Sequence, residues 1–152
     1  FVALAPKELW PNEQLTAEMK KVAAATGGTI EFFDISQKDA ALKGADVLYT
    51  DVWVSMGEEA KFAERIAQLK DYRVTMDFIK RTGNPDCVFL HCLPAFHDQE
   101  TEVGRQVGKD HGVLEQEVSD EVFRSRHSVV FDEAENRLHT IKAVMVATIG
   151  RQ

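Results

Sequence analysis

Two short segments of the chain carry side chains that could bind a small charged molecule and act on it. The first is Asp51-Val52-Trp53-Val54-Ser55-Met56-Gly57. Asp51 could bind an ammonium group, while Ser55 and free backbone N–H groups near a helix start could bind a carboxylate. This pattern favours a site for a zwitterion. The alternative is that Asp51 caps a turn and Ser55 caps the helix that follows.

The second segment is His91-Cys92-Leu93-Pro94, which follows an apolar run. A cysteine placed there would face a crevice, where nearby charge could favour a reactive thiolate. The alternative is a buried, inert cysteine, and this alternative fits Cys87, inside the apolar run, better still. A metal set made of His91, Cys92, His97 and Asp98 is a further possibility, but the spacing matches no common zinc pattern. We therefore expect no metal site.

A third segment, Glu135-Asn136-Arg137-Leu138-His139-Thr140, opens the last predicted helix. The planar guanidinium of Arg137 could bind a phosphate or a carbonyl oxygen. The alternative is a solvated helix face with an ordinary ion pair between Glu133 and Arg137. Residues 143–147 are apolar around the whole helix, which a surface helix does not need. We expect the last helix, about 133–149, to pack against a missing domain or another subunit.

The rest of the chain alternates short apolar runs, typical of buried strands, with helical patterns. This alternation predicts an α/β fold, a three-layer sandwich with a mostly parallel, Rossmann-like sheet of about five strands. In such sheets ligands bind outside the carboxyl ends of the strands, where the first two segments lie. The predicted strands cover 1–5, 29–33, 46–50, 87–90 and 128–131, the predicted helices cover 12–25, 39–43, 58–69, 74–80, 119–124 and 133–149, and 98–116 is predicted as a surface loop with some helix.

Composition fits one folded domain and excludes several classes of protein. A chain of 152 residues with 44% hydrophobic residues is not disordered, and its net charge of −7 disfavours general nucleic-acid or anionic-membrane binding. Two cysteines do not make a disulfide scaffold, which favours a reducing compartment. Glycine-rich phosphate loops and the G-x-S-x-G elbow are absent from the sequence. Because the chain begins with Phe1 inside an apolar run, we expect it to be part of a longer protein.

Taken together and in this order, the motifs D-x-W-x-S-M-G from Asp51, H-C-L-P from His91 and E-N-R from Glu135 resemble the ornithine carbamoyltransferases of the aspartate/ornithine carbamoyltransferase family. The resemblance covers nearly all of residues 1–152. It corresponds to the carboxyl-terminal, ornithine-binding domain, incomplete at its amino-terminal end. The H-C-L-P motif alone would indicate only the wider family. The D-x-x-x-S-M-G loop indicates ornithine rather than aspartate, putrescine or an acetylated ornithine.

The resemblance implies transfer of a carbamoyl group from carbamoyl phosphate to the δ-amine of L-ornithine, giving L-citrulline and phosphate in arginine metabolism. It implies that Asp51 and Ser55 hold the α-amino group of ornithine. Ser55 and Met56 would lie on a loop that closes over the substrate. Cys92 would lie beside the δ-amine and assist its deprotonation, since an amine must be neutral to attack a carbonyl.

On the carbamoyl side, the resemblance implies that the backbone carbonyls of Cys92 and Leu93 accept hydrogen bonds from the carbamoyl NH₂ and that Arg137 contacts the carbamoyl oxygen. The family motifs S-T-R-T-R, H-P-x-Q and G-D-x-x-N are absent, because they belong to segments that precede this one. We therefore expect the chain alone to be inactive. As alternatives, the chain could belong to a related transcarbamylase acting on another amine, or be a non-catalytic amino-acid-binding or interaction module.

The resemblance also implies a cytoplasmic enzyme that needs no cofactor and no metal. The expected partners are the small-molecule substrates and other copies of the same chain, as a trimer or a trimer-based assembly. Nucleic acids and membranes are not expected partners.

Overall fold

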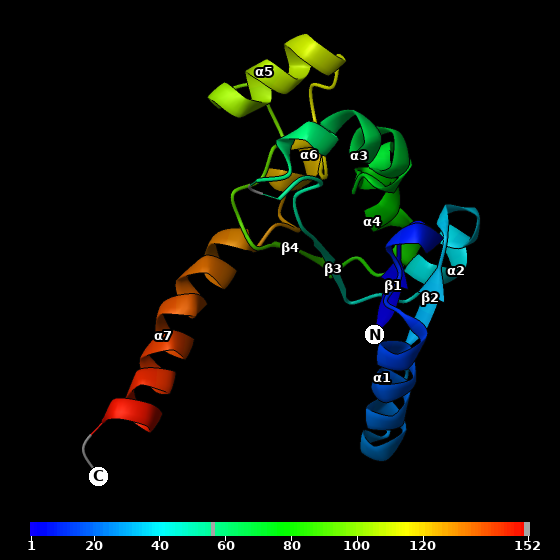
Figure 1. Cartoon of the computed structure of the whole chain (residues 1–152), viewed down its shortest axis with the longest axis vertical. Coiled ribbons are helices and arrows are strands. Elements are labelled where there is room, and N and C mark those ends of the chain that lie inside the picture. Colours follow the sequence, from blue (N-terminus) through cyan, green and yellow to red (C-terminus); the bar gives the residue numbers. More distant parts are fainter. Residues whose placement is uncertain (56, 151–152) are drawn as a thin grey trace.

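The computed structural model describes residues 1–55 and 57–150 and has an α/β architecture (Figure 1). The predicted alternation of strands and helices is confirmed along most of the chain. The strands are β1 (Val2–Leu4), β2 (Glu31–Phe33), β3 (Val47–Thr50) and β4 (Val88–His91), and the helices are α1 (Glu13–Thr26), α2 (Lys38–Leu42), α3 (Phe62–Leu69), α4 (Met76–Thr82), α5 (Glu102–His111), α6 (Asp120–Phe123) and α7 (Val130–Ile149), with short 3₁₀ helices over Lys7–Leu9, Ile35–Gln37, Glu59–Lys61 and Lys70–Tyr72.

The strands pair in parallel, β1 with β2 and β3 with β4. In the described part of the chain these pairs form two separate two-stranded sheets, so the predicted single sheet of about five strands is not found. The register of the second pair sets Thr50 of β3 opposite His91 of β4. These two residues end their strands, so the loops that follow them start side by side.

The predicted fifth strand over 128–131 is wrong. Ser128 forms a single parallel bridge to Phe89, and the Val129 N–H donates to the Phe89 carbonyl (3.1 Å). The chain then enters α7 at Val130, earlier than the predicted start near 133. A short apolar run is compatible with either a strand or a buried helix turn. Packing favours the helix here, because Val130 in its first turn is buried at 1% exposure.

The hydrophobic core surrounds β4, whose Phe89 is fully buried. By contrast, β1 and β2 contribute no fully buried residue. Among the strand ends of the described structure, the end of β4 is therefore the one held most firmly by packing in the core. The core cluster consists of Leu42, Val74, Phe78, Ile79, Cys87, Phe89, Val118, Val122 and Val130.

Helix α1 shows how local sequence sets the boundaries of an element. The Asn12 side chain accepts a hydrogen bond from the Leu15 N–H (2.8 Å), which satisfies one of the unpaired donors at the helix start. Gly27 ends the helix with φ of 73°, a left-handed conformation that glycine adopts without steric cost. The predicted helix over 12–25 is confirmed within one residue at each end.

Helix α7 projects away from the rest of the chain, and its carboxyl end lies far from the strands (Figure 1). Val130 is its one buried residue in the described structure. Leu138, Ile141, Met145 and Ile149 are three to four positions apart and 49–74% exposed. The helix thus presents an apolar stripe to solvent. No helix in the described ranges is both long and apolar enough to cross a membrane.

Candidate active site

Asp51 and Cys92 meet at the carboxyl ends of β3 and β4. Each residue directly follows the last residue of its strand, and parallel pairing brings both strand ends to the same edge. The Cys92 thiol donates a hydrogen bond to Asp51 Oδ1, with Sγ and Oδ1 3.0 Å apart. The Val52 N–H donates to the same oxygen (2.7 Å). The structure therefore joins two predicted site residues that are 41 positions apart.

The environment of Cys92 favours the thiol over the thiolate. Partial burial of the sulfur, the hydrogen bond to Asp51 and the charge of Asp51 raise the pKa of Cys92 above its ordinary value of 9.0, and a hydrogen bond with Tyr49 opposes them. The expectation that nearby charge favours a thiolate is wrong in this structure, because that charge is a carboxylate. Cys87 is 1% exposed with its pKa also raised by burial, as expected of an inert cysteine.

Tyr49 belongs to the same polar group, and sequence reasoning did not select it. It precedes Asp51 by two positions, so the alternation of an extended chain directs both side chains to the same side. Partial burial and the nearby Cys92, Glu133 and Asp51 raise the pKa of Tyr49, so its hydroxyl keeps its proton. A tyrosine two positions before a strand-end carboxylate is the signal that could have identified it.

The buried side chains of His91 and Glu117 hold the His91-Cys92-Leu93 turn in place. His91 Nδ1 accepts a hydrogen bond from the Leu93 N–H (2.9 Å), so the neutral ring carries its proton on Nε2, which donates to Glu117 Oε1 (3.1 Å). Both side chains are 0% exposed. Glu117 Oε1 also accepts a hydrogen bond from the Phe96 N–H (2.6 Å). Leu93 has φ of 51°, a conformation that costs a side-chain-bearing residue about 1–2 kcal/mol, and the bond to His91 helps to hold it.

Arg137 lies on α7, and its side chain is exposed. One turn earlier, Glu133 Oε2 accepts a hydrogen bond from the His91 N–H (3.0 Å), which ties the start of α7 to the end of β4. Glu133 therefore does not pair with Arg137, contrary to the alternative considered from the sequence. Within the described ranges, the Arg137 guanidinium makes no hydrogen bond or ion pair, and none joins it to Cys92 or Asp51.

The loop after β3 is anchored at its middle. Trp53 and Val54 are buried at 8% and 7% exposure, whereas Asp51 and Ser55 are exposed. The Ser55 carbonyl accepts a hydrogen bond from the Glu58 N–H (3.0 Å). Its hydroxyl caps no helix and binds no other side chain in the described part of this loop. Met56, the other residue predicted to bind substrate here, lies outside the described residues.

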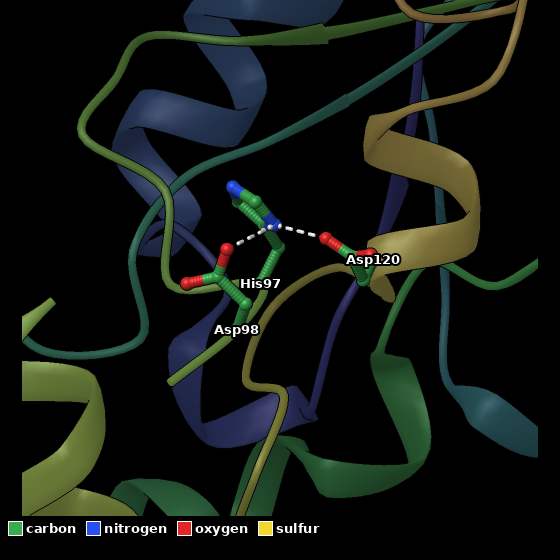
Figure 2. A group of neighbouring side chains, drawn as sticks. All are labelled: His97, Asp98 and Asp120. Carbon is green, nitrogen blue, oxygen red and sulfur yellow. Dashed lines mark hydrogen bonds and ion pairs between the residues drawn. The ribbon is translucent and has the colours of Figure 1, made fainter. Parts of the chain in front are cut away.

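One group of side chains has the composition of a cation site, and it lies apart from Asp51 and Cys92. His97 Nδ1 is 2.7 Å from Asp120 Oδ1 and 3.5 Å from Asp98 Oδ2 (Figure 2). Arg124 donates to the same two oxygens, from Nε at 2.8 Å and from Nη2 at 3.1 Å. The carboxylates that would bind a metal cation are therefore already paired with the positive charge of Arg124. This group is an ion-pair network.

The four residues considered from the sequence as a metal set do not meet at one point. His91 uses both ring nitrogens for hydrogen bonds within the protein, and Cys92 contacts Asp51. His97 and Asp98 belong to the ion-pair network just described. The hollow beside that network, of about 510 Å³, is lined by neither Asp51 nor Cys92. The candidate site at the two strand-end loops is therefore separate from that network and its hollow.

The chain is similar to one family of enzymes over almost its whole length. The family model described as "Aspartate/ornithine carbamoyltransferase, Asp/Orn binding domain" matches residues 1–148. A catabolic ornithine carbamoyltransferase of Bacillus licheniformis is 60% identical over 145 residues, which cover 95% of this chain and 43% of that protein. One of Clostridium perfringens is 56% identical over 152 residues, which cover 99% of this chain and 45% of that protein.

Solved structures give the same result at the level of the fold. The ornithine carbamoyltransferase from Pyrococcus furiosus superposes with a TM-score of 0.75 at 39% sequence identity, over 95% of this chain and 40% of that one. That from Campylobacter jejuni superposes with a TM-score of 0.73 at 32% identity, over 95% of this chain and 42% of that one. The chain thus spans less than half the length of the relatives that it matches.

Proposed function

Because this chain belongs to the aspartate/ornithine carbamoyltransferase family, we propose that it is the ornithine-binding part of an enzyme that carbamoylates the δ-amine of L-ornithine. Carbamoyl phosphate is the donor, and L-citrulline and phosphate are the products. The observation that carries the proposal is the Asp51–Cys92 contact at two neighbouring strand ends. A carboxylate binds an ammonium group, and a thiol exchanges a proton with an amine. An amino acid with a second amino group offers one amine to the carboxylate and the other to the thiol.

Asp51 and Ser55 bind the α-amino group of ornithine in this proposal. Asp51 is exposed, and in the described structure its side chain accepts hydrogen bonds only from neutral groups, the Val52 N–H and the Cys92 thiol. Its negative charge is therefore uncompensated. A bound ammonium group compensates it. Ser55 lies on the exposed part of the same loop, and its hydroxyl makes no hydrogen bond with the described residues. Met56 follows it in the segment that closes over the substrate.

Cys92 acts on the δ-amine, which is mostly protonated at pH 7 and cannot attack a carbonyl in that form. In the absence of a cation, partial burial and Asp51 raise the pKa of Cys92 and keep the thiol protonated. A bound ammonium group lowers the pKa of a neighbouring thiol, so Cys92 releases its proton to solvent. The thiolate then accepts a proton from the δ-ammonium, and the neutral amine attacks the carbamoyl carbon. Substrate binding thus converts Cys92 into a base.

The carbamoyl group lies on the other side of Cys92. The backbone carbonyls of Cys92 and Leu93 accept hydrogen bonds from its NH₂ group, and Arg137 stabilises the negative charge that develops on its oxygen. The tie between Glu133 and the His91 N–H supports this assignment, because it fixes the start of α7 against the Cys92 turn. The phosphate contacts come from the part of the protein outside these 152 residues.

The two small sheets belong to one Rossmann-like sheet of a three-layer sandwich in this proposal. Doubly wound sheets have the spatial order 3-2-1-4-5, so a chain that supplies strands 2 to 5 forms two separate parallel pairs. The pairs β2-β1 and β3-β4 have this arrangement. Strand 1 then lies between β1 and β3, whose facing edges have no strand partner in the described structure. Apolar side chains on these strands, Val2, Val47 and Tyr49, are 40–56% exposed.

The complete enzyme is a cytoplasmic homo-oligomer, a trimer or a trimer-based assembly, that needs no cofactor. The apolar stripe of α7 packs against the amino-terminal, carbamoyl-phosphate-binding half. Both cysteines are free thiols, which suits a reducing compartment. The 152 residues alone bind carbamoyl phosphate weakly and do not turn over.

The test is a citrulline assay on the purified whole protein with carbamoyl phosphate and a panel of amines. We expect L-ornithine to be carbamoylated at its δ-amine, with putrescine and N-acetyl-ornithine at least about 100-fold less efficient, because a site built for a polar group rejects analogues that leave its partners unpaired. Absence of citrulline would refute carbamoyl transfer to ornithine. A preference for putrescine would assign the chain to a related transcarbamylase.

A further inference from the structure

Trp53 connects the loop that carries Asp51 and Ser55 to the body of the protein. Its side chain is buried at 8% exposure, as is that of Val54, whereas Asp51 and Ser55 at the two ends of the loop are exposed. The guanidinium carbon of Arg73 lies 6.0 Å from the centre of the indole ring. An arginine at this distance from a tryptophan is attracted to the ring electrons, more strongly where water is excluded.

Besides its contact with Trp53, the Arg73 side chain is held by a backbone carbonyl and by a carboxylate. Its Nε donates to the Gln116 carbonyl (2.8 Å), and its Nη1 lies 3.8 Å from Glu115 Oε2. The next residue, Val74, is fixed by a parallel bridge in which its N–H donates to the Glu117 carbonyl and its carbonyl accepts from the Ser119 N–H, both at 3.0 Å. Arg73 is therefore held by contacts other than the one with Trp53.

The same support holds the second loop of the site. Glu117, next to the carbonyl that Arg73 binds, accepts hydrogen bonds from His91 and Phe96 and so fixes the turn that carries Cys92. The segment 115–119 thus reaches both strand-end loops, the Cys92 turn through Glu117 and the Asp51 loop through Arg73 and Trp53. The separation between the amine-binding and proton-accepting groups depends on both connections.

We propose that Arg73 is a positioning residue for amino-acid binding, which holds the Asp51–Ser55 loop at the correct distance from Cys92 by packing on Trp53. The inference rests on the proposed function. Arg73 itself contacts no substrate. Its loss leaves the loop free to move relative to the Cys92 turn, so the α-amino group is held poorly while the chemistry at Cys92 is preserved once ornithine is bound.

The test compares Arg73→Met, which keeps the aliphatic stem, with Arg73→Lys, which keeps the charge and loses the planar fork, in the whole protein. We expect Arg73→Met to raise KM for ornithine about tenfold while kcat and KM for carbamoyl phosphate change less than about twofold. Arg73→Lys should recover part of the loss. Arg126→Met is the matched control, because Arg126 also donates to a backbone carbonyl (Pro85, 2.9 Å) but is exposed and contacts neither loop. An unchanged KM in Arg73→Met, or an equal change in the control, overturns the proposal.

A second measurement separates this inference from the proposed function. Hydrogen exchange followed by mass spectrometry should show faster exchange in residues 52–55 of Arg73→Met, with unchanged exchange in β4. In a Trp53→Leu background the Arg73→Met change should have little further effect, because the two residues act through one contact. If the wild-type protein makes no citrulline, the proposed function fails while these measurements still test the contact. If citrulline forms and exchange in 52–55 is unaffected by Arg73→Met, the positioning role fails alone.

Discussion

The Cys92 thiol donates a hydrogen bond to Asp51 across the ends of two parallel strands, with Sγ and Oδ1 3.0 Å apart. In the proposed function, the contact combines a carboxylate that binds an ammonium group with a thiol that exchanges a proton. Partial burial and the contact with Asp51 both raise the pKa of Cys92, which lowers the fraction of the nucleophilic thiolate. Such an arrangement protects an exposed cysteine from oxidation and alkylation.

Removal of the Asp51 charge should make Cys92 more reactive. The carboxylate raises the pKa of the thiol, so Asp51→Asn lowers that pKa and increases the thiolate fraction at every pH below it. At pH 8 we expect alkylation of Cys92 by iodoacetamide to become roughly three- to tenfold faster, measured on the Cys92 peptide by mass spectrometry. Asp110→Asn on α5 is the control. An unchanged rate would mean that Asp51 does not govern the thiol.

Replacement of Cys92 by alanine in the whole protein should reduce kcat for citrulline formation. General base catalysis contributes about 10²- to 10⁴-fold, and Cys92→Ala removes the group that accepts the amine proton. The loss should shrink as pH rises, because solvent then deprotonates more of the bound amine. A kcat within twofold of wild type across the pH range would remove Cys92 from the chemistry.

Glu117→Ala should destabilise the protein far more than its position in a polar segment suggests. The change leaves the buried His91 Nε2–H and the partly buried Phe96 N–H without an acceptor, at a cost of about 2–4 kcal/mol in the free energy of unfolding. Urea denaturation measures the loss, and Glu121→Ala, an exposed neighbour on α6, should change stability by less than about 0.5 kcal/mol. Equal effects of the two substitutions would show that the buried pair is not what holds the Cys92 turn.

The apolar stripe of α7 gives a prediction about the rest of the protein. Ile141 is 49% exposed in this chain, and in the proposed complete enzyme it is covered by the amino-terminal half. Ile141→Glu should therefore lower the stability of the whole protein by at least about 2 kcal/mol, the cost of placing a charge at an apolar interface. Thr140→Glu, which lies outside the apolar stripe of the helix, is the control. If both variants denature at the same temperature as wild type, the stripe is not an interface.

The sequence alone predicted most elements, because their signals are local. Asn12 and Gly27 bound α1 through contacts within a few positions of the chain, and the motifs beginning at Asp51 and His91 follow directly after apolar strands. The fifth strand failed for the same reason, since the apolar run at 128–131 suits a strand or a helix and only burial of Val130 chose between them. Local patterns thus determined the order of the elements and the positions of the two loops that we propose to carry the chemistry.

Tertiary structure alone decided how these groups act on one another. The contact between Asp51 and Cys92 depends on the register of β3 with β4. Because partial burial and this contact raise the pKa of Cys92, the structure favours a thiol where the sequence led us to expect a thiolate. Glu117 joined the site because the core buries it against a histidine 26 positions away. Protonation, ring tautomer and loop position follow from distances and burial, which act across the fold, whereas sequence patterns describe only neighbours along the chain.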